Sequence, residues 1–345
     1  MSRTAVVIYN LGGPDSPDAV RPFLKNLFSD PMILRMPAPV RAFLSRFIAW
    51  RRAPVAREIY AQIGGRSPIL PETEKQAVAL QKVLGDTYRV FIAMRYWHPF
   101  AEETAKDVAA WKPDRVVLMP LYPQFSTTTT ESFTRIWTPA AQAAGMDVPT
   151  AEICCWPEAA GFIDAMTRAT EASIDRLPHE LAYRILYSAH GLPKKIVEAG
   201  DPYAHQVERT AAAVHKKLRD PAADHVICYQ SRVGPMEWLK PYTEDEIRRA
   251  GADGKALVVV PVAFVSEHSE TLVELDIEYS ELAEEAGVPA YIRAPAVNDD
   301  PAFIETLASI VRGAGNTGTA AGGEICAAGF ADCPCNGQDS TREAT

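Results

Sequence analysis

Apolar, β-branched segments alternate with helix-like segments along most of this 345-residue chain, and this alternation constrains the fold more than any other feature. Such an alternation predicts βαβ units, in which parallel strands are joined by helices that cover the sheet. The expected strands are residues 5–9, 88–95, 114–120, 151–155, 183–189, 225–230, 256–264 and 290–294. The expected helices are residues 17–28, 71–84, 99–111, 130–144, 158–176, 202–219, 267–287 and 300–312.

The spacing of these strands predicts two similar halves. Eight strands exceed one open sheet with a single site, and they divide evenly about residues 155–180. We therefore expect an α/β fold with two Rossmann-like lobes, each with a four-stranded parallel sheet flanked by helices, and an active cleft between the lobes. The expected domains are residues 1–160, residues 161–312, and a linker with a cysteine-bearing tail, residues 313–345.

The composition excludes several classes of protein. A formal net charge of −9 and a pI near 5.4 argue against a nucleic-acid surface, which needs a concentrated basic face, so small molecules or cations are the expected partners. No apolar run approaches the length of a membrane span, and residues 1–13 lack the features of a signal peptide. Six cysteines in such a chain favour buried thiols or metal binding over disulfides, and with them a cytoplasmic location.

A row of acidic residues follows the buried strand that ends near residue 264. Glu270, Glu274 and Glu278 recur every four residues, which places their carboxyl groups on one face of a helix, with His268 beside the first turn. One interpretation is a solvated face whose first acids complement the helix N-terminus. The other is a proton or cation pathway into a cleft, since open α/β sheets build their sites at the carboxyl ends of strands.

Other chemically active side chains also lie where expected strands open into loops. His190 follows the strand at residues 183–189 and precedes a loop with glycine and proline, where a histidine can act as a base or a metal ligand. Arg95 and Arg232 suit substrate carboxylates, and aromatic residues at strand ends suit stacking on a flat conjugated ligand. These aromatic candidates are Tyr96, Tyr122, Phe125 and Trp238.

Residues 31–57 interrupt the alternation. They contain six arginines and no acidic residue, together with many large apolar side chains. This composition is typical of a basic amphipathic segment. Two interpretations stay open: a helix packed on its lobe with arginines in solvent, or a lip that covers the ligand or touches an anionic membrane from the surface.

Five motifs together resemble the signatures of the protoporphyrin ferrochelatases. The resemblance is collinear over about residues 5–312, and the last motif is the most specific. The motifs are Asn10–Pro14, Gly64–Ile69, Ser188–Pro193, Gln230–Pro241 and Ser266–Tyr279.

The resemblance implies an enzyme that inserts Fe²⁺ into protoporphyrin IX to give protohaem, on two Rossmann-like lobes and without a nucleotide. It implies that His190 is the family's histidine and Glu270 its paired carboxylate, both acting as base or as ligands of the Fe²⁺ substrate, with His268 and Glu274 behind them. It also implies that the substrate contacts Arg95, Tyr96, Tyr122, Gln230, Ser231 and Trp238. This chain departs from the family at residues 61–62, where Ala61 and Gln62 replace arginine, so Arg95 is the better candidate for a propionate.

Three cysteines cluster in the tail. Cys333 and Cys335 are too close for an easy mutual disulfide but suit one metal centre, and Cys326 lies seven residues before Cys333. This spacing resembles the tail of bacterial ferrochelatases that carry a 2Fe-2S cluster, and implies a fourth thiolate from the body of the protein. Mitochondrial members supply it from the loop that matches Thr127, so here Cys154 or Cys155 would replace it. Four thiolates on zinc, or free thiols, are the alternatives.

Two other functions use the same features. A chelatase for another tetrapyrrole, such as one that inserts cobalt into a corrin precursor, could share the lobes, the histidine and the glutamate. An iron or haem carrier, or a cluster-based sensor, would bind ligand without turnover. Ser266–Tyr279 and Gln230–Trp238 favour the ferrochelatase over both.

Overall fold

The computed structural model describes residues 2–320, 326 and 329–335, which form two compact units. Among these residues, the first unit comprises 2–122, 126–154 and 307–320, and the second comprises 123–125, 155–306, 326 and 329–335. The expected boundary near residue 160 lies close to the break after residue 154. Residues 307–320 join the first unit, although the sequence predicts them in the second domain and the linker.

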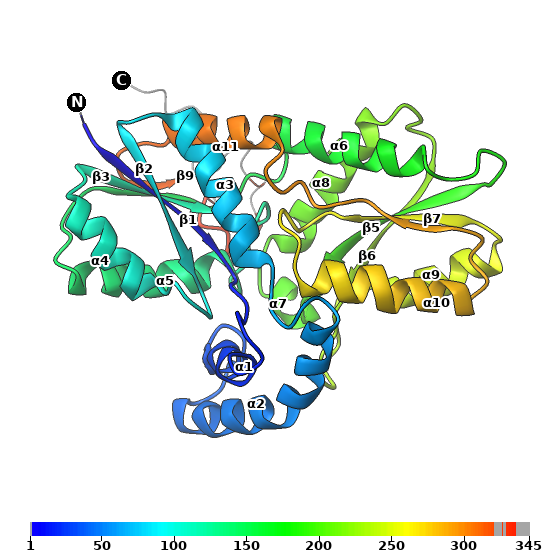
Figure 1. The fold of residues 1–345 in the computed structure, drawn as a ribbon, viewed down its shortest axis with the longest axis horizontal. Helices are drawn as coiled ribbons and strands as arrows, with labels where there is room; N and C mark the ends of the chain where they lie inside the picture. The colour runs from blue at the N-terminus through cyan, green and yellow to red at the C-terminus, as the bar shows by residue number, and fades with distance from the viewer. Residues whose placement is uncertain (1, 321–325, 327–328, 336–345) are drawn as a thin grey trace. The chain divides into compact units, whose positions relative to one another are not determined.

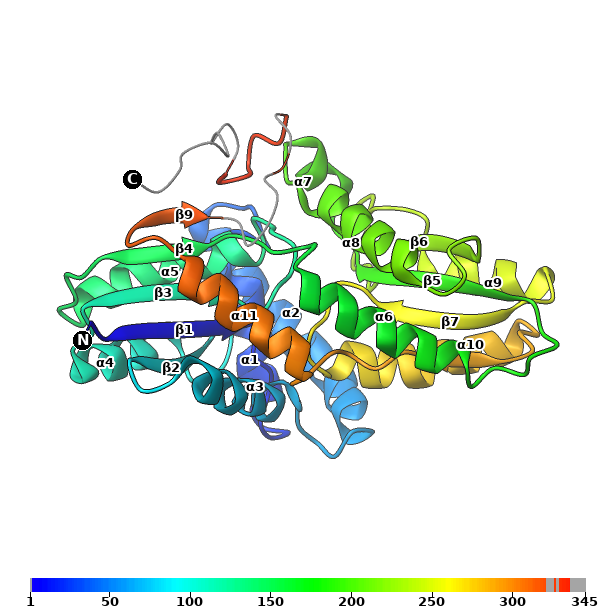
Figure 2. The ribbon, with the colours of Figure 1, turned by 90° about the horizontal axis from the view of Figure 1, so that it is seen from above.

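The first unit is built on a parallel sheet with strand order β2-β1-β3-β4-β9 (Figure 2). Figure 1 shows α4 and α5 on one face of this sheet and α3 with α11 on the other. Its elements are β1 (Thr4–Asn10), α1 (Val20–Ser29), α2 (Ala38–Ala61), α3 (Ile69–Leu84), β2 (Tyr88–Met94), α4 (Ala101–Trp111), β3 (Arg115–Pro120), α5 (Thr130–Ala143), β4 (Thr150–Ile153), the last half of α11 (Pro301–Gly313) and β9 (Gly318–Ala320).

The second unit is built on a parallel sheet with strand order β6-β5-β7-β8. Helices α6 and α8 cover one face, and α9 and α10 cover the other (Figure 1). Its elements are α6 (Ala160–Ile174), β5 (Tyr183–His190), α7 (Lys194–Glu198), α8 (Tyr203–Lys217), β6 (Asp224–Gln230), α9 (Thr243–Ala252), β7 (Ala256–Pro261), η1 (Glu270–Glu278), α10 (Tyr279–Glu285), β8 (Tyr291–Arg293) and the first half of α11.

The α/β class with two helix-flanked parallel sheets is confirmed, but the sheets have five and four strands rather than four each. The additional strand, β9, lies in the expected linker and pairs with β4 through Glu152 and Thr319. Sequence patterns miss it because three small or polar residues carry no apolar signal. Backbone pairing alone places it at the edge of the sheet.

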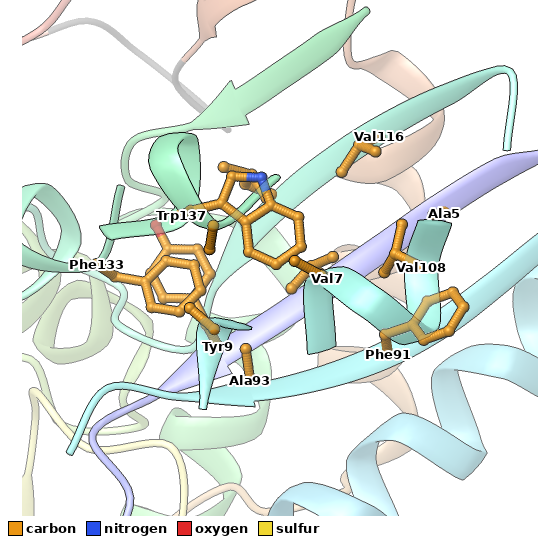
Figure 3. Close-up of a cluster of buried hydrophobic side chains, with 13 residues drawn as sticks. Ala5, Val7, Tyr9, Phe91, Ala93, Val108, Val116, Phe133 and Trp137 are labelled. Atoms are coloured by element: carbon orange, nitrogen blue, oxygen red, sulfur yellow. The ribbon is translucent and has the colours of Figure 1, made fainter. Parts of the chain in front are cut away.

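Burial on both faces explains why β1 is an uninterrupted apolar run. On the face toward α4 and α5, side chains from three neighbouring strands form one cluster, in which the ring of Tyr9 stacks on Phe133 with centroids 3.9 Å apart (Figure 3). Trp137 extends this stack from the next turn of α5. The cluster fixes the end of β1, and with it the loop at residues 10–14.

Helix α2 buries small side chains along most of its length, and Tyr60 near its end is its one large buried side chain. Ala49 and Ala53 are buried in the cluster that packs α2 against α1, whereas Phe43, Phe47 and Trp50 are exposed. The expectation of an amphipathic segment with arginines in solvent is therefore only partly right, because apolar and basic side chains share the exposed surface. No helix within the described residues is long and apolar enough to cross a membrane.

Candidate functional site

Adjacent strands of the second unit bring the site residues together. Strand β5 ends at His190, which pairs in register with Gln230 at the end of β6. The segment after β7 carries His268 and Glu270 into η1. Because parallel strands end at the same edge of a sheet, side chains that are 80 residues apart in sequence become neighbours.

Glu270 lies between two histidines. Its Oε1 is 3.8 Å from Nε2 of His190, and its Oε2 is 3.5 Å from Nε2 of His268. The side chains of His190 and Glu270 are 35% and 28% exposed, whereas that of His268 is 8% exposed. The His190 end of the cluster is therefore the end that a substrate can reach.

Backbone carbonyls fix the orientation of both imidazoles. Nδ1 of His190 lies 2.6 Å from the carbonyl oxygen of Gly191, and Nδ1 of His268 lies 3.1 Å from that of Ser266. A carbonyl only accepts, so Nδ1 carries the proton in each neutral ring and Nε2 keeps its lone pair. Nε2 of His268 faces Glu270 and donates to it when that nitrogen carries a proton, whereas Nε2 of His190 is the more accessible position for a proton or a metal ion.

The electrostatic surroundings of Glu270 favour its ionised form. Burial opposes ionisation, but the charges of His190 and His268 and the hydrogen bond from His268 outweigh it and lower the pKa of Glu270 to about 2. Glu270 is therefore an anion at neutral pH.

Glu274, one turn further along, is held by four donors. Its Oε1 accepts hydrogen bonds from the backbone N–H of Ser231 at 2.9 Å and the hydroxyl of Tyr279 at 3.1 Å. Its Oε2 accepts from Nε2 of Gln230 at 3.0 Å and from the hydroxyl of Ser231. Ser231 has a φ of +64°, which is unfavourable for a side chain other than glycine and directs both its donors at Glu274.

The pKa of Glu274 is shifted in the opposite direction to that of Glu270. Burial and the negative charge of Glu270 raise the pKa of Glu274 above its ordinary value, although Ser231, His190 and Gln230 act against the shift. Two carboxyl groups with divergent pKa values, linked to a histidine, are an arrangement that accepts and passes protons. The pathway interpretation of the acid row stays a prediction for Glu270 and Glu274, and Glu278 is exposed.

The helix that carries both acids is a π-helix, not the α-helix that the sequence predicts. Residues 270–278 form η1, and the N–H of Tyr279 donates to the carbonyl of Glu274, a five-residue step. Helix α10 continues the chain from Tyr279. Wider turns of this kind are rare and concentrate at functional sites.

Trp238 and Gly191 form a wall beside His190. The Trp238 ring centroid is 6.3 Å from that of His190, and its indole N–H donates to the carbonyl of Val233 at 3.1 Å. A Cβ on Gly191 would come within 3.1 Å of the indole and 3.0 Å of the carbonyl of Gln230, so glycine allows this close approach. Tyr203 supports the same strand end by donating to the carbonyl of His190 at 3.0 Å.

In the first unit, Arg95 and Tyr96 share a buried partner. Nη2 of Arg95 lies 2.8 Å from Asp30, and the hydroxyl of Tyr96 donates to the same oxygen at 2.7 Å. Tyr96 is 1% exposed, so its ring supports Arg95 and its stacking on a flat ligand stays a prediction. Tyr122 packs against the cluster of Figure 3 and meets Tyr9 edge to face.

Sequence reasoning missed four residues that hold the site residues in place. Asp30 and Ser132 bind Arg95, while Tyr203 and Tyr279 bind His190 and Glu274. Tyr279 lies inside a motif that the sequence singles out, at five residues from Glu274, and this spacing is the available signal. Asp30 carries no such signal, because it contacts residues more than 60 positions away.

The tail cysteines lie near one body cysteine of the second unit. Nε2 of Gln206 donates to the sulfur of Cys326 at 3.0 Å and to that of Cys155 at 3.5 Å. A hydrogen bond between Cys326 and Cys333 lowers the pKa of Cys326 to about 6 and raises that of Cys333. Cys335 is buried as well.

Within residues 2–320, 326 and 329–335, no group of three or more His, Cys, Asp or Glu side chains is arranged to hold a metal ion. The iron–sulfur cluster therefore stays a prediction. The donor set itself suits such a group, because buried cysteines that share hydrogen bonds are the residue type that binds iron–sulfur clusters.

Comparison with solved structures defines the class of the fold. The chain matches SirB from Bacillus subtilis with Fe³⁺ at a TM-score of 0.52, 11% identity, and coverage of 90% of this chain and 94% of that one. It matches the sirohydrochlorin chelatase SirB from Bacillus subtilis subspecies spizizenii in complex with cobalt at a TM-score of 0.51 and 9% identity, with coverage of 90% of this chain and 94% of that one. At such low identity these matches show the fold alone, which is that of the chelatase-like proteins.

The sequence comparisons are more specific. The ferrochelatase family model matches residues 3–314. Ferrochelatase from Caulobacter vibrioides (strain NA1000 / CB15N) is 51% identical over 342 residues, which cover 96% of this chain and 97% of that protein. The ferrochelatase of Phenylobacterium zucineum (strain HLK1) is 51% identical over 96% of this chain and 98% of that protein. The ferrochelatase of Rickettsia bellii (strain OSU 85-389) is 44% identical over 96% of this chain and 95% of that protein.

The chain therefore belongs to the ferrochelatase family. Its activity is that of a metal-chelating lyase, the insertion of Fe²⁺ into protoporphyrin IX in haem synthesis. This family assignment favours the ferrochelatase over the corrin chelatase and the carrier.

Proposed function

We propose that His190, Glu270 and Glu274 remove the two pyrrole protons that protoporphyrin loses when iron enters the ring. The observation that carries this proposal is the position of Glu270 between the Nε2 atoms of His190 and His268. The reaction exchanges one Fe²⁺ for two protons, so the site must supply a base and a route by which protons leave.

His190 is the proposed first acceptor. Its Nε2 holds a lone pair while Nδ1 donates to Gly191, and its side chain is among the accessible parts of the cluster. When Nε2 takes a proton, the adjacent anion of Glu270 stabilises the imidazolium. In the deprotonated state, the same nitrogen and a Glu270 oxygen are suitable transient ligands for the Fe²⁺ substrate.

Glu274 is the proposed relay. The pKa of Glu274 is raised whereas that of Glu270 is lowered, so Glu274 binds a proton more readily than Glu270 does and can pass it on. The hydroxyls of Ser231 and Tyr279 can donate to the ionised carboxyl group or accept from the protonated one, whereas the amide N–H of Gln230 donates to it in both states. His268 fixes the far side of Glu270 and acts as a positioning residue.

In the second unit, the porphyrin is proposed to lie against Trp238 near His190. In the first unit, Arg95 is the proposed partner of a propionate. Trp238 is an apolar wall, and Gln230 and Ser231 join this wall to the relay through Glu274. Tyr96 and Tyr122 support the arginine side in the first unit. A bent macrocycle needs rigid walls, which buried aromatic side chains provide.

The tail is proposed to bind a 2Fe-2S cluster through Cys326, Cys333, Cys335 and Cys155. Cys155 is preferred to Cys154 as the fourth ligand, since it shares the amide of Gln206 with Cys326. The tail also contacts the body where Phe330 stacks on His205, with centroids 5.0 Å apart. Such a cluster would cross-link the tail to the body of the second unit.

Peripheral contact with anionic membranes is proposed for residues 31–57. Phe43, Phe47 and Trp50 are exposed on the same helix as Arg46 and Arg51. Exposed aromatic and basic side chains together suit the surface of a bilayer with anionic lipids, and a hydrophobic substrate would be available there.

A direct test is anaerobic mixing of the purified protein with Fe²⁺ and protoporphyrin, with haem absorption bands as the readout. The wild type should form haem, and His190→Ala should fold normally but lose nearly all turnover. His179→Ala is the matched control, because His179 is exposed away from the cluster, and it should keep the wild-type rate. Near-normal turnover by His190→Ala would remove His190 from the mechanism.

A further inference from the structure

Asp30 is a buried carboxylate outside the motifs that the sequence singles out. It follows α1, and its side chain is 1% exposed. One oxygen accepts hydrogen bonds from Nη2 of Arg95 at 2.8 Å, from the hydroxyl of Tyr96 at 2.7 Å and from the hydroxyl of Ser132. The other accepts from the backbone N–H of Met32 at 2.7 Å. Burying a carboxylate is costly unless donors satisfy it, and four do so here.

This carboxylate fixes Arg95 from one side while Ser132 fixes it from another. Nε of Arg95 donates to the hydroxyl of Ser132 at 2.7 Å and to its carbonyl at 3.1 Å. The guanidinium lies over the ring of Tyr96, 4.8 Å from the centroid. Its third nitrogen, Nη1, makes no hydrogen bond to any described residue, and the side chain is 15% exposed.

We propose that Asp30 is a positioning residue for substrate recognition, which holds Arg95 so that Nη1 meets a carboxylate of the porphyrin. The proposal rests on the assignment of Arg95 to a propionate under the proposed function. A free arginine would have to give up its side-chain rotamers on binding, whereas this one is already ordered. Because Asp30 offsets much of the positive charge, Arg95 recognises a carboxylate through directed hydrogen bonds more than through net charge.

A purely structural role for Asp30 has a different consequence. Its backbone carbonyl accepts from Ile33 and Leu34, so Asp30 also shapes the connection to α2. If that were its whole role, loss of the carboxylate would weaken the binding of every porphyrin alike. A positioning role weakens the binding of a porphyrin with free carboxylates and spares one without them.

The experiment measures dissociation constants for protoporphyrin and its dimethyl ester in detergent, by quenching of tryptophan fluorescence in the full chain. Asn in place of Asp30 keeps the shape but puts an amide where three donors converge. Asp30→Asn should therefore weaken diacid binding about tenfold and change ester binding less than twofold. Arg95→Met should do the same, and the double variant should be no weaker than Arg95→Met, since the two residues act as one unit.

Ser132→Ala keeps the test decisive if Asp30→Asn does not fold. It removes a hydroxyl that donates to Asp30 and accepts from Arg95, and should weaken diacid binding about threefold while sparing the ester. Asp224→Asn is the control, because it disrupts a different arginine–carboxylate pair, with Arg184 in the second unit, and should leave the diacid-to-ester ratio unchanged.

Equal weakening of both porphyrins by Asp30→Asn, or an unchanged ratio, would overturn the role of Asp30. If Arg95→Met lowers the ratio and Asp30→Asn does not, the Arg95 assignment survives and the positioning role fails. If Arg95→Met itself leaves the ratio unchanged, Arg95 does not recognise the carboxylate, and the role of Asp30 fails with it. Metal insertion by the wild type is a separate readout of the proposed function.

Discussion

At the scale of single residues, the site depends on two carboxyl groups that lie four positions apart and have opposite surroundings. Glu270 faces two histidines, whereas Glu274 faces Glu270 and neutral donors. Coulomb attraction lowers the pKa of the first, while burial and repulsion raise that of the second. The same residue type thus has a lowered pKa at one position and a raised pKa four positions later.

The lowered pKa of Glu270 predicts a pH dependence of stability. Its folded value is about 2 against an ordinary 4.5, so its stabilising contribution is present above pH 4.5 and is lost as the pH falls toward 2. Urea unfolding of wild type and Glu270→Gln should show a difference in unfolding free energy of about 1–3 kcal/mol at pH 6 that falls by roughly half by pH 3. A difference that stays constant over this range would contradict the ion pairing.

At the scale of elements, sequence patterns predicted most strands and helices but missed those without an apolar signature. The run of residues 257–264 is recognisable because both faces of β7 are buried. Helices α7 and α9 were missed, because α9 has a charged sequence and α7 spans only five residues. The π-helix was predicted as an α-helix because, over nine residues, the two periods place the acids on similar faces.

Some residues of the candidate site could likewise be predicted from the sequence, and others could not. His190, Glu270 and Glu274 could be predicted because each follows or adjoins the carboxyl end of a strand. The contact of Asp30 with Ser132 could not, since it joins a residue that follows α1 to one on α5 across 102 positions. The exposure of the large aromatic side chains of α2 could not be predicted either, because composition does not say which face of a helix packs against the protein.

Exposed aromatic side chains on α2 predict binding to anionic vesicles. The full chain should float with phosphatidylserine-containing liposomes at low salt and dissociate as salt screens the arginines. Replacing Phe47 and Trp50 by serine should abolish flotation, because they supply the exposed apolar surface. Val78→Ser is the control, since Val78 is an apolar side chain that is more exposed than Phe47 and Trp50 but lies on α3, and its replacement should not matter. Equal loss of flotation with Val78→Ser, or no flotation of the wild type at any salt, would oppose the proposal.

At the scale of the whole chain, the C-terminal segment contributes to both units separately. In the first unit, Arg115 binds the carbonyls of Ala314 and Gly315 at 3.1 Å, and β9 extends the sheet. In the second, the N–H of Asp332 donates to the carbonyl of Gly200 at 3.2 Å. The segments after α11 that the structure describes are thus hydrogen-bonded to the two units, although composition suggested a flexible linker.

The anchored tail predicts a visible chromophore. Protein purified without oxygen should be red-brown, and Cys333→Ser or Cys335→Ser should abolish the colour and lower the melting temperature by several degrees, because the cross-link to the body is lost. Cys155→Ser should do the same, whereas Cys154→Ser and Cys228→Ser should retain the absorption. Metal analysis that finds stoichiometric zinc and no sulfide would contradict the cluster.

The central claim is that Glu270 acts at the reacting atoms and Glu274 passes protons, and turnover numbers of their glutamine variants test it most directly. Glutamine preserves shape but cannot ionise, so the effect should fall on kcat at saturating protoporphyrin and Fe²⁺ rather than on porphyrin affinity. Glu270→Gln should lower kcat at least 100-fold and Glu274→Gln about tenfold. Near-wild-type rates for both variants would contradict the account and return the acid row to a solvated face.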